Sequence, residues 1–155
     1  MEDAKIVDVL NELVETSRDG VAGFNTCAES AKEVMLKAYF ETRKQECEQA
    51  VRDLNVEVAH HHGKAAEHGT IAGSLNRAWT NIKATVLTND NLAVLEECEK
   101  AEDAALASYR KALKEDLPAH VKELVQKQCD GAKINHDRVR KLRDEHRQAA
   151  AVTAE

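Results

Sequence analysis

VLEECEKAEDAALASYRKAL, residues 94–113, is the stretch that decides the fold. Its apolar residues recur at the three- and four-residue spacing of one helix face. That face consists of Leu95, Cys98, Ala101, Glu102, Ala105, Leu106, Tyr109 and Leu113. At about 100° per residue, the carboxylate of Glu102 points into the middle of this face. We therefore expect Glu102 to be buried and to need a cation, a metal ion or a proton, because an unpaired buried charge is too costly.

The composition around this stretch predicts a single all-helical domain. The chain has 155 residues, 43% hydrophobic and 32% charged, with few aromatic residues and one proline. This length suits one domain with one core, and the scarcity of helix breakers favours helices throughout. The net charge of −6 argues against a general nucleic-acid binder, which needs a dominant basic surface.

The same composition places the chain in a reducing compartment and away from lipid. No stretch approaches the roughly 20 apolar residues of a membrane span, and the acidic N-terminus MEDAKIVDVL is unlike a signal peptide. The cysteines form no CxxC pair, so we expect free thiols that pack as small apolar residues in a cytoplasmic protein. They are Cys27, Cys47, Cys98 and Cys129.

Helical periodicity and capping signals predict four long helices and one shorter helix. Ser30 with Glu33 resembles a capping box, Asp90 suits an N-cap, and Pro118 suits the first turn of a helix. The expected helices are 3–27, a second that starts after Ser30 and ends near Gly63, a shorter one at about 70–87, 91–114 and 118–147. We expect one domain over 1–148 and a frayed tail at 149–155.

The long connection between the second and third long helices predicts the topology. Such a connection carries the chain from one end of a bundle to the other, so those two helices should run parallel, as in a ferritin-like four-helix bundle with a crossover. Thr16, Gly20, Gly23 and Cys27 form a strip of small residues beside the apolar stripe of the first helix. We expect a neighbouring helix to approach this strip closely, or a second subunit to use it in a homodimer.

Four segments carry a family resemblance. They are LNELVETSRDGVAGF (10–24), SLNRAWTNIKA (74–84), VLEECEKAEDAALASY (94–109) and HDRVRKLRD (136–144). Together they resemble a bacterial family of ferritin-like four-helix-bundle proteins classed only as a domain of unknown function, over roughly 3–144. The resemblance implies a ferritin-like bundle and supplies no reaction.

Many ferritin-like bundles hold two metal ions with a Glu on each of two helices and a Glu-x-x-His on each of the other two. This chain contains no Glu-x-x-His, and its nearest approximations are Glu46-x-x-Gln49 and Glu99-x-x-Glu102. An iron or manganese site in this chain would therefore use a reduced set of ligands. Its candidates are Glu102, Glu99, Glu46 and His136.

A buried polar layer is the arrangement that we favour for Glu102 over a metal site. Arg43 falls between Phe40 and Cys47 in the apolar arc of the second helix, at a similar depth in the bundle. An Arg43–Glu102 pair, helped by Gln128 or Asn135, would neutralise the carboxylate without metal.

A second metal hypothesis comes from His60, His61, His62 and His68, which cluster after the second helix. Imidazoles this close can bind Zn²⁺, Ni²⁺ or Cu²⁺ adventitiously, but we favour a solvated, histidine-rich connection.

These patterns leave three functional hypotheses. The first is a non-enzymatic bundle without a cofactor, in a stress-associated or assembly role. The second is a carboxylate-bridged iron or manganese oxidase or storage protein, and the third is a helical groove that binds another protein. We expect no nucleophilic catalysis, because the sequence has no Gly-rich phosphate loop and no recognisable Ser-His-Asp arrangement.

Overall fold

The computed structural model describes residues 1–66 and 74–154, and the side chains of 1–66 and 79–153. These residues form five α-helices and, within the described ranges, no strand. The helices are α1 (Asp3–Ser30), α2 (Val34–His60), α3 (Ser74–Val86), α4 (Asn91–Leu113) and α5 (Ala119–Ala154). The all-α bundle predicted from composition and periodicity is confirmed.

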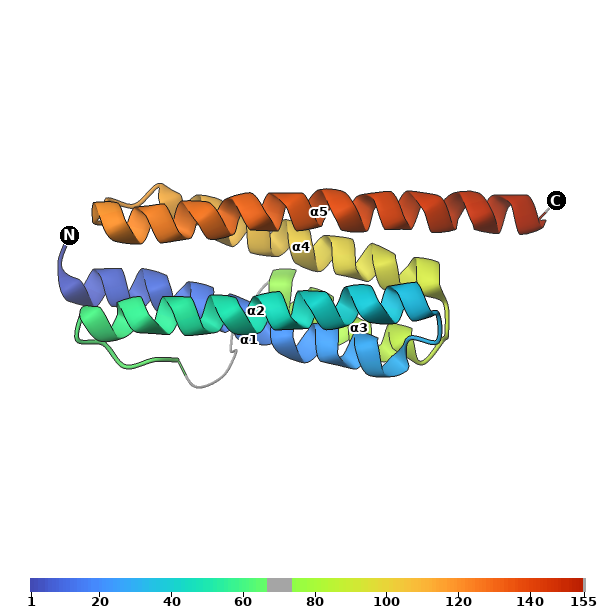
Figure 1. Cartoon of the computed structure of the whole chain (residues 1–155), viewed down its shortest axis with the longest axis horizontal. Coiled ribbons are helices and arrows are strands. Elements are labelled where there is room, and N and C mark those ends of the chain that lie inside the picture. Colours follow the sequence, from blue (N-terminus) through green and yellow to red (C-terminus); the bar gives the residue numbers. More distant parts are fainter. Residues whose placement is uncertain (67–73, 155) are drawn as a thin grey trace.

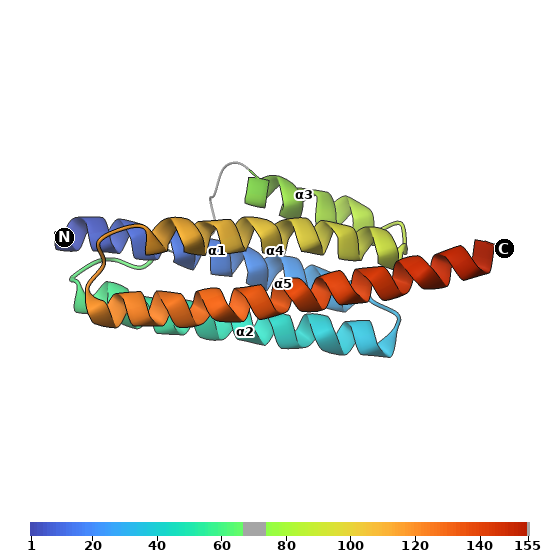
Figure 2. The same ribbon diagram turned by 90° about the horizontal axis from the view of Figure 1, so that it is seen from above.

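The four long helices form two antiparallel hairpins joined by a crossover (Figure 1). The α1–α2 hairpin and the α4–α5 hairpin pack side by side, and α2 ends at the opposite end of the bundle from the start of α4 (Figures 1 and 2). As a result α2 and α4 run in the same direction, which is the direction predicted from the length of the connection. The shorter helix α3 lies on the outside of the bundle against α1 and α4.

The predicted cap of α4 is present, whereas the cap predicted for α2 is not. The Asp90 carboxylate accepts a hydrogen bond of 3.2 Å from the Ala93 amide and caps α4 as predicted. The capping box predicted at Ser30 is wrong, because Ser30 is the last residue of α1 and Glu33 is the N-cap of α2, with no side-chain hydrogen bond to the helix end. The first helix absorbs Ser30 because its periodic pattern continues to Ala28, which is fully buried.

The C-terminal helix is longer than expected. We expected it to end near Arg147 and a tail to fray over 149–155, but α5 continues to Ala154. The residues that continue it are Ala149, Ala150 and Ala151, and alanine is the strongest helix former. None of the described helices is long and apolar enough to cross a membrane.

The buried apolar side chains of the described residues form two large clusters, one toward each end of the bundle. One cluster joins the early part of α1 to the ends of α2 and α4 and the start of α5, with Leu10, Leu54 and Val121 fully buried. The other joins the late part of α1 to the start of α2 and α4, around Phe24 and Leu95. The middle of the bundle, between these clusters, holds the buried polar side chains described below.

Side chains of neighbouring helices pack directly against the strip of small residues on α1. A Cβ atom at Gly20 would lie 2.7 Å from Cys47 Sγ, and one at Gly23 would lie 2.1 Å from the Trp79 ring of α3. The predicted close approach is therefore present, and α3 is one of the helices that makes it. Trp79 covers Gly23, which is one of the residues that a second subunit could have used. The predicted homodimer remains a prediction.

A substitution at Gly23 tests this packing. Gly23→Ala should destabilise the protein by about 1–3 kcal/mol, because the Trp79 ring must move away from the added methyl group. Urea unfolding monitored by far-ultraviolet circular dichroism measures the change.

Gly131→Ala is the matched control. No atom lies within 4 Å of a Cβ at Gly131, so the same change within α5 should stabilise the protein by up to about 1 kcal/mol through helix propensity. Equal effects at the two glycines would contradict the packing of α3 on α1.

Candidate functional site

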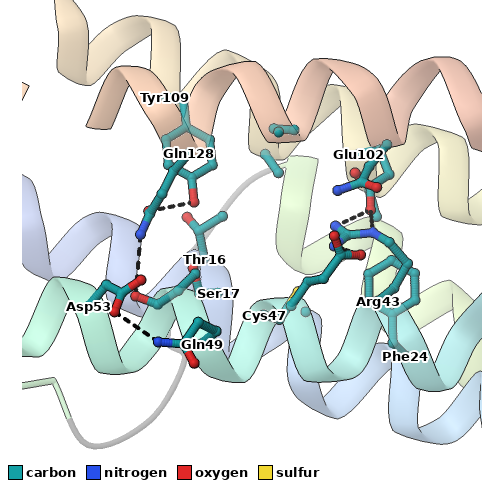
Figure 3. A pocket seen from close by; sticks show the side chains of 18 of the residues that line it. Thr16, Ser17, Phe24, Arg43, Cys47, Gln49, Asp53, Glu102, Tyr109 and Gln128 are labelled. Carbon is teal, nitrogen blue, oxygen red and sulfur yellow. Dashed lines mark hydrogen bonds and ion pairs between the residues drawn. The ribbon is translucent and has the colours of Figure 1, made fainter. Parts of the chain in front are cut away.

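The Arg43–Glu102 ion pair lies in the middle of the bundle. Helical spacing places Arg43 on the same face of α2 as Phe40 and Cys47, and it directs the guanidinium toward α4. Oε1 of Glu102 accepts hydrogen bonds from Nη2 of Arg43 at 2.8 Å and from Nε at 3.2 Å (Figure 3). The residues are 7% and 2% exposed, so this pair is almost completely removed from water.

Two further groups hold the guanidinium in place. Its central carbon lies 4.9 Å from the centre of the Phe24 ring, a distance typical of a cation–π contact. Its Nη1 lies 3.4 Å from Oε1 of Glu46, which is much more exposed than Glu102. The second carboxylate oxygen of Glu102 is buried without a hydrogen-bond partner. Glu102 therefore keeps one free acceptor inside the protein.

Burial and charge act in opposite directions on this pair. Burial raises the pKa of the Glu102 carboxyl above its ordinary value, and the positive charge of Arg43 reduces this effect. For Arg43 burial acts to lower the pKa, but the charge and hydrogen bond of Glu102, together with smaller contributions from Cys47 and Tyr39, outweigh it and the net direction is upward. The pair is therefore charged only because each partner supplies the counter-charge of the other.

A cavity of about 300 Å³ lies beside the ion pair. Figure 3 shows Arg43 and Glu102 at one end of this cavity and Tyr109 and Gln128 at the other. The Tyr109 hydroxyl donates to Oε1 of Gln128 at 3.0 Å, and Nε2 of Gln128 donates to the carbonyl of Ala50 at 3.5 Å. Asn135 is buried and lines the same cavity. The four residues of the polar layer considered in the sequence thus share one cavity, although only Arg43 and Glu102 contact each other directly.

The lining of the cavity favours binding over covalent chemistry. The polar residues that line it include Glu102, Asn135, Thr16 and Ser17, and one carboxylate oxygen of Glu102 has no hydrogen-bond partner. Its thiol, Cys47, has a pKa raised to about 11 by burial and is therefore a poor nucleophile near neutral pH. The cavity can hold a small molecule that donates a hydrogen bond to Glu102.

The candidate metal ligands fall into two separate groups. Glu46 and Glu102 both contact Arg43. Glu99 and His136 instead lie together with Asp103, with Nε2 of His136 2.5 Å from Oδ1 of Asp103. Arg143 forms an ion pair with Glu99. The four predicted ligands therefore do not meet at one point, because two of them surround a guanidinium.

The cysteines do not make a metal site either. All four are buried, and within the described residues no group of three or more metal donors includes a cysteine. Cys27 Sγ and Cys98 Sγ lie 3.9 Å apart. The hydrogen bond with Cys27 and complete burial raise the pKa of Cys98 well above its ordinary value, so this thiol is unreactive at neutral pH.

Two features of the described residues were not anticipated. Asp103 joins Glu99 and His136, and the spacing of four residues between Glu99 and Asp103 was the available signal. Glu57, His61 and His120 form a second group of possible metal donors at one end of the bundle. His120 belongs to another helix, so no local spacing connects it to the histidines after α2. His68 lies outside the described residues.

Comparison with known proteins identifies the family of this chain. A family model with the description "Domain of unknown function (DUF2383)" matches residues 5–115. The chain belongs to this family. The match to DUF2383 runs from α1 to just beyond α4, so it contains both Arg43 and Glu102. No curated protein matches the chain.

A double-mutant cycle measures the central ion pair of this DUF2383 protein. Glu102→Leu and Arg43→Met should each destabilise it by about 3–5 kcal/mol, because each leaves one buried charge unpaired. The double variant should cost much less than the sum, since no unpaired charge remains. Urea unfolding at neutral pH gives the three free energies.

Glu46→Gln is the control for this cycle. It removes the exposed partner of Arg43 and should change the unfolding free energy by less than about 1 kcal/mol. A coupling energy within about 0.5 kcal/mol of zero between Arg43 and Glu102 would show that the two charges do not depend on each other.

The pH dependence of Arg43→Met gives an independent test. Without Arg43, burial is unopposed and the folded state should bind a proton on Glu102 more tightly than the unfolded state does. Relative to the wild type, the variant should therefore be least destabilised below about pH 4.3 and become more destabilised as the pH rises toward neutrality.

Urea titrations at several pH values measure this slope. The excess slope should vanish in the double variant Arg43→Met with Glu102→Gln, which lacks the carboxyl group. An identical slope in the single and double variants would mean that Glu102 does not titrate in the folded protein.

Proposed function

We propose that this protein is a non-enzymatic helical bundle in which the Arg43–Glu102 pair takes the place that a metal centre has in ferritin-like proteins. The observation that supports this is the double hydrogen bond from Arg43 to Oε1 of Glu102. A guanidinium at this position opposes a divalent cation, because like charges repel strongly where little water screens them.

This arrangement favours a protein that binds a ligand over an enzyme that converts a substrate. The cavity beside the pair offers hydrogen-bonding groups, and its only cysteine has a raised pKa. A stress-associated or assembly role, in which the bundle binds a small polar molecule or another protein, agrees with this arrangement. Four free buried thiols also suit a reducing compartment such as the cytoplasm.

A carboxylate-bridged iron or manganese protein is the second candidate. It is favoured by the meeting of Glu99, Asp103 and His136 between α4 and α5. Arg143 and Asp137 compete for two of these side chains, since Arg143 pairs with Glu99 and Asp137 lies 3.3 Å from Nδ1 of His136. We therefore rank it below the non-enzymatic role.

Elemental analysis separates the two candidates. The protein is expressed without a histidine tag in medium supplemented with iron and manganese, and the metal per chain is measured for wild type, Glu102→Ala and His136→Ala. We expect no iron or manganese whose binding depends on Glu102 or His136, and no faster oxidation of ferrous ion by oxygen than in buffer.

Two results would replace the proposal with its alternative. About two equivalents of iron or manganese per chain, lost in Glu102→Ala, would indicate a dinuclear centre in the middle of the bundle. Metal lost only in His136→Ala would place a site at the Glu99–Asp103–His136 group. In either case, rapid ferrous oxidation would make the protein an oxidase.

We further propose that the protein is a homodimer, because symmetric dimers are the commonest oligomers. Light scattering at micromolar concentration should give twice the chain mass of 17.2 kDa. A mass near that of a single chain would contradict this proposal.

A further inference from the structure

A group of histidines and carboxylates joins three helices at one end of the bundle. There α2 ends at His60, α5 begins at Ala119 and α1 begins at Asp3 (Figure 1). Glu57 lies in the last turn of α2, His61 caps that helix, and His120 lies in the first turn of α5. The site is thus built from parts of the chain about 60 residues apart, and it is separate from the Arg43–Glu102 pair.

Three donor atoms converge in this group. Nε2 of His61 lies 3.4 Å from Nε2 of His120, and Nε2 of His120 lies 3.3 Å from Oε2 of Glu57. All three atoms lie within 4.8 Å of one another. The two imidazole rings are nearly parallel, at an angle of 9°.

These separations match the edges of a metal coordination tetrahedron. Zinc binds histidine nitrogen and carboxylate oxygen at about 2.0–2.2 Å, and two ligands at tetrahedral angles on such bonds are about 3.3–3.6 Å apart. Both distances to Nε2 of His120 fall in or at the edge of this range. Two histidines and one glutamate also form a known zinc ligand set, with a fourth position left for water.

A carboxylate orients the first imidazole toward the other donors. Oδ1 of Asp3 lies 2.9 Å from Nδ1 of His61, so the Nδ1–H group donates a hydrogen bond to this carboxylate oxygen. In the neutral ring Nε2 then carries the lone pair that faces His120 and Glu57. Such a carboxylate behind a metal-binding histidine fixes the tautomer and strengthens the ligand.

The polar atoms of this group are not all satisfied by hydrogen bonds within the protein. Oε2 of Glu57 is buried without a hydrogen-bond partner, although the histidine nitrogen stands 3.3 Å away. The contact between the two Nε2 atoms is long for a hydrogen bond, and it can exist only if one of the nitrogens lacks a proton. A cation between the three atoms would satisfy all of them at once.

We propose that Glu57, His61 and His120 bind a divalent transition-metal ion of the zinc type, oriented by Asp3. The ion would fasten the C-terminal end of α2 to the start of α5, two helices that otherwise make few backbone contacts. This inference goes beyond the proposed function and does not depend on it.

Zinc binding to the protein without a histidine tag tests the proposal. After treatment with a chelator, the protein is titrated with zinc chloride in a calorimeter and with cobalt(II) in a spectrophotometer. We expect about one equivalent of zinc per chain, the intense visible absorption of tetrahedral cobalt and a higher melting temperature with zinc.

The variants separate a built site from loose binding by neighbouring histidines. His120→Ala should weaken zinc binding by more than about 100-fold, and Asp3→Asn by about 10-fold. His120 is 58% exposed, so its replacement leaves the core intact. His62→Asn is the matched control, because His62 has a φ of 60° that asparagine tolerates and belongs to no donor group.

Three results would overturn the proposal. They are an absence of zinc binding by the wild type, equal binding by His120→Ala and wild type, or loss of binding in His62→Asn alone. The last two would assign the metal to the consecutive histidines after α2. The double variant Glu102→Leu with Arg43→Met, in which no buried charge is left unpaired, should bind zinc normally, so this test and the iron analysis can fail separately.

Discussion

A charge inside a helical bundle needs a partner, and this requirement organises the middle of the molecule. Glu102 occupies a core position of α4 and would be too costly there alone. Arg43 reaches it from α2 and is itself stacked on Phe24 of α1. One ion pair thereby ties three of the long helices to a common depth. It also divides the core, since the two large apolar clusters lie on either side of it.

The crossover makes this pairing possible. Because α2 and α4 run in the same direction, side chains at similar distances from their N-terminal ends meet at the same level, and Arg43 and Glu102 are such a pair. The returning segment places α3 against α1 and α4, where Gly23 leaves room for Trp79. The small residues of α1 therefore allow α3 to pack against the bundle. The connection that contains α3 is also the one that makes α2 and α4 run in the same direction.

Two polar regions of the bundle differ in what they can bind. In the middle, a positive guanidinium occupies the position beside Glu102, and the remaining cavity suits a small molecule that donates hydrogen bonds. At the end of α2, two imidazoles and a carboxylate face one another. The first arrangement opposes a divalent metal ion, whereas the second has the spacing that such an ion requires. Both regions contain a buried or half-buried glutamate, and the neighbouring cation or imidazoles set what each carboxylate can bind.

The sequence by itself determined the features that follow from the position of each residue around its own helix. It predicted the all-α bundle, the burial of Glu102 and Arg43, the cap at Asp90 and the direction of α2 and α4. It failed at Ser30, where two helix patterns overlap, and at the tail, where alanines extend α5. Only the tertiary structure decided which side chains meet across helices, as His120 does with His61, or His136 with Asp103. The physical reason is that phase repeats every 3.6 residues along one helix, whereas the axial offset between two helices is set by how their side chains pack together.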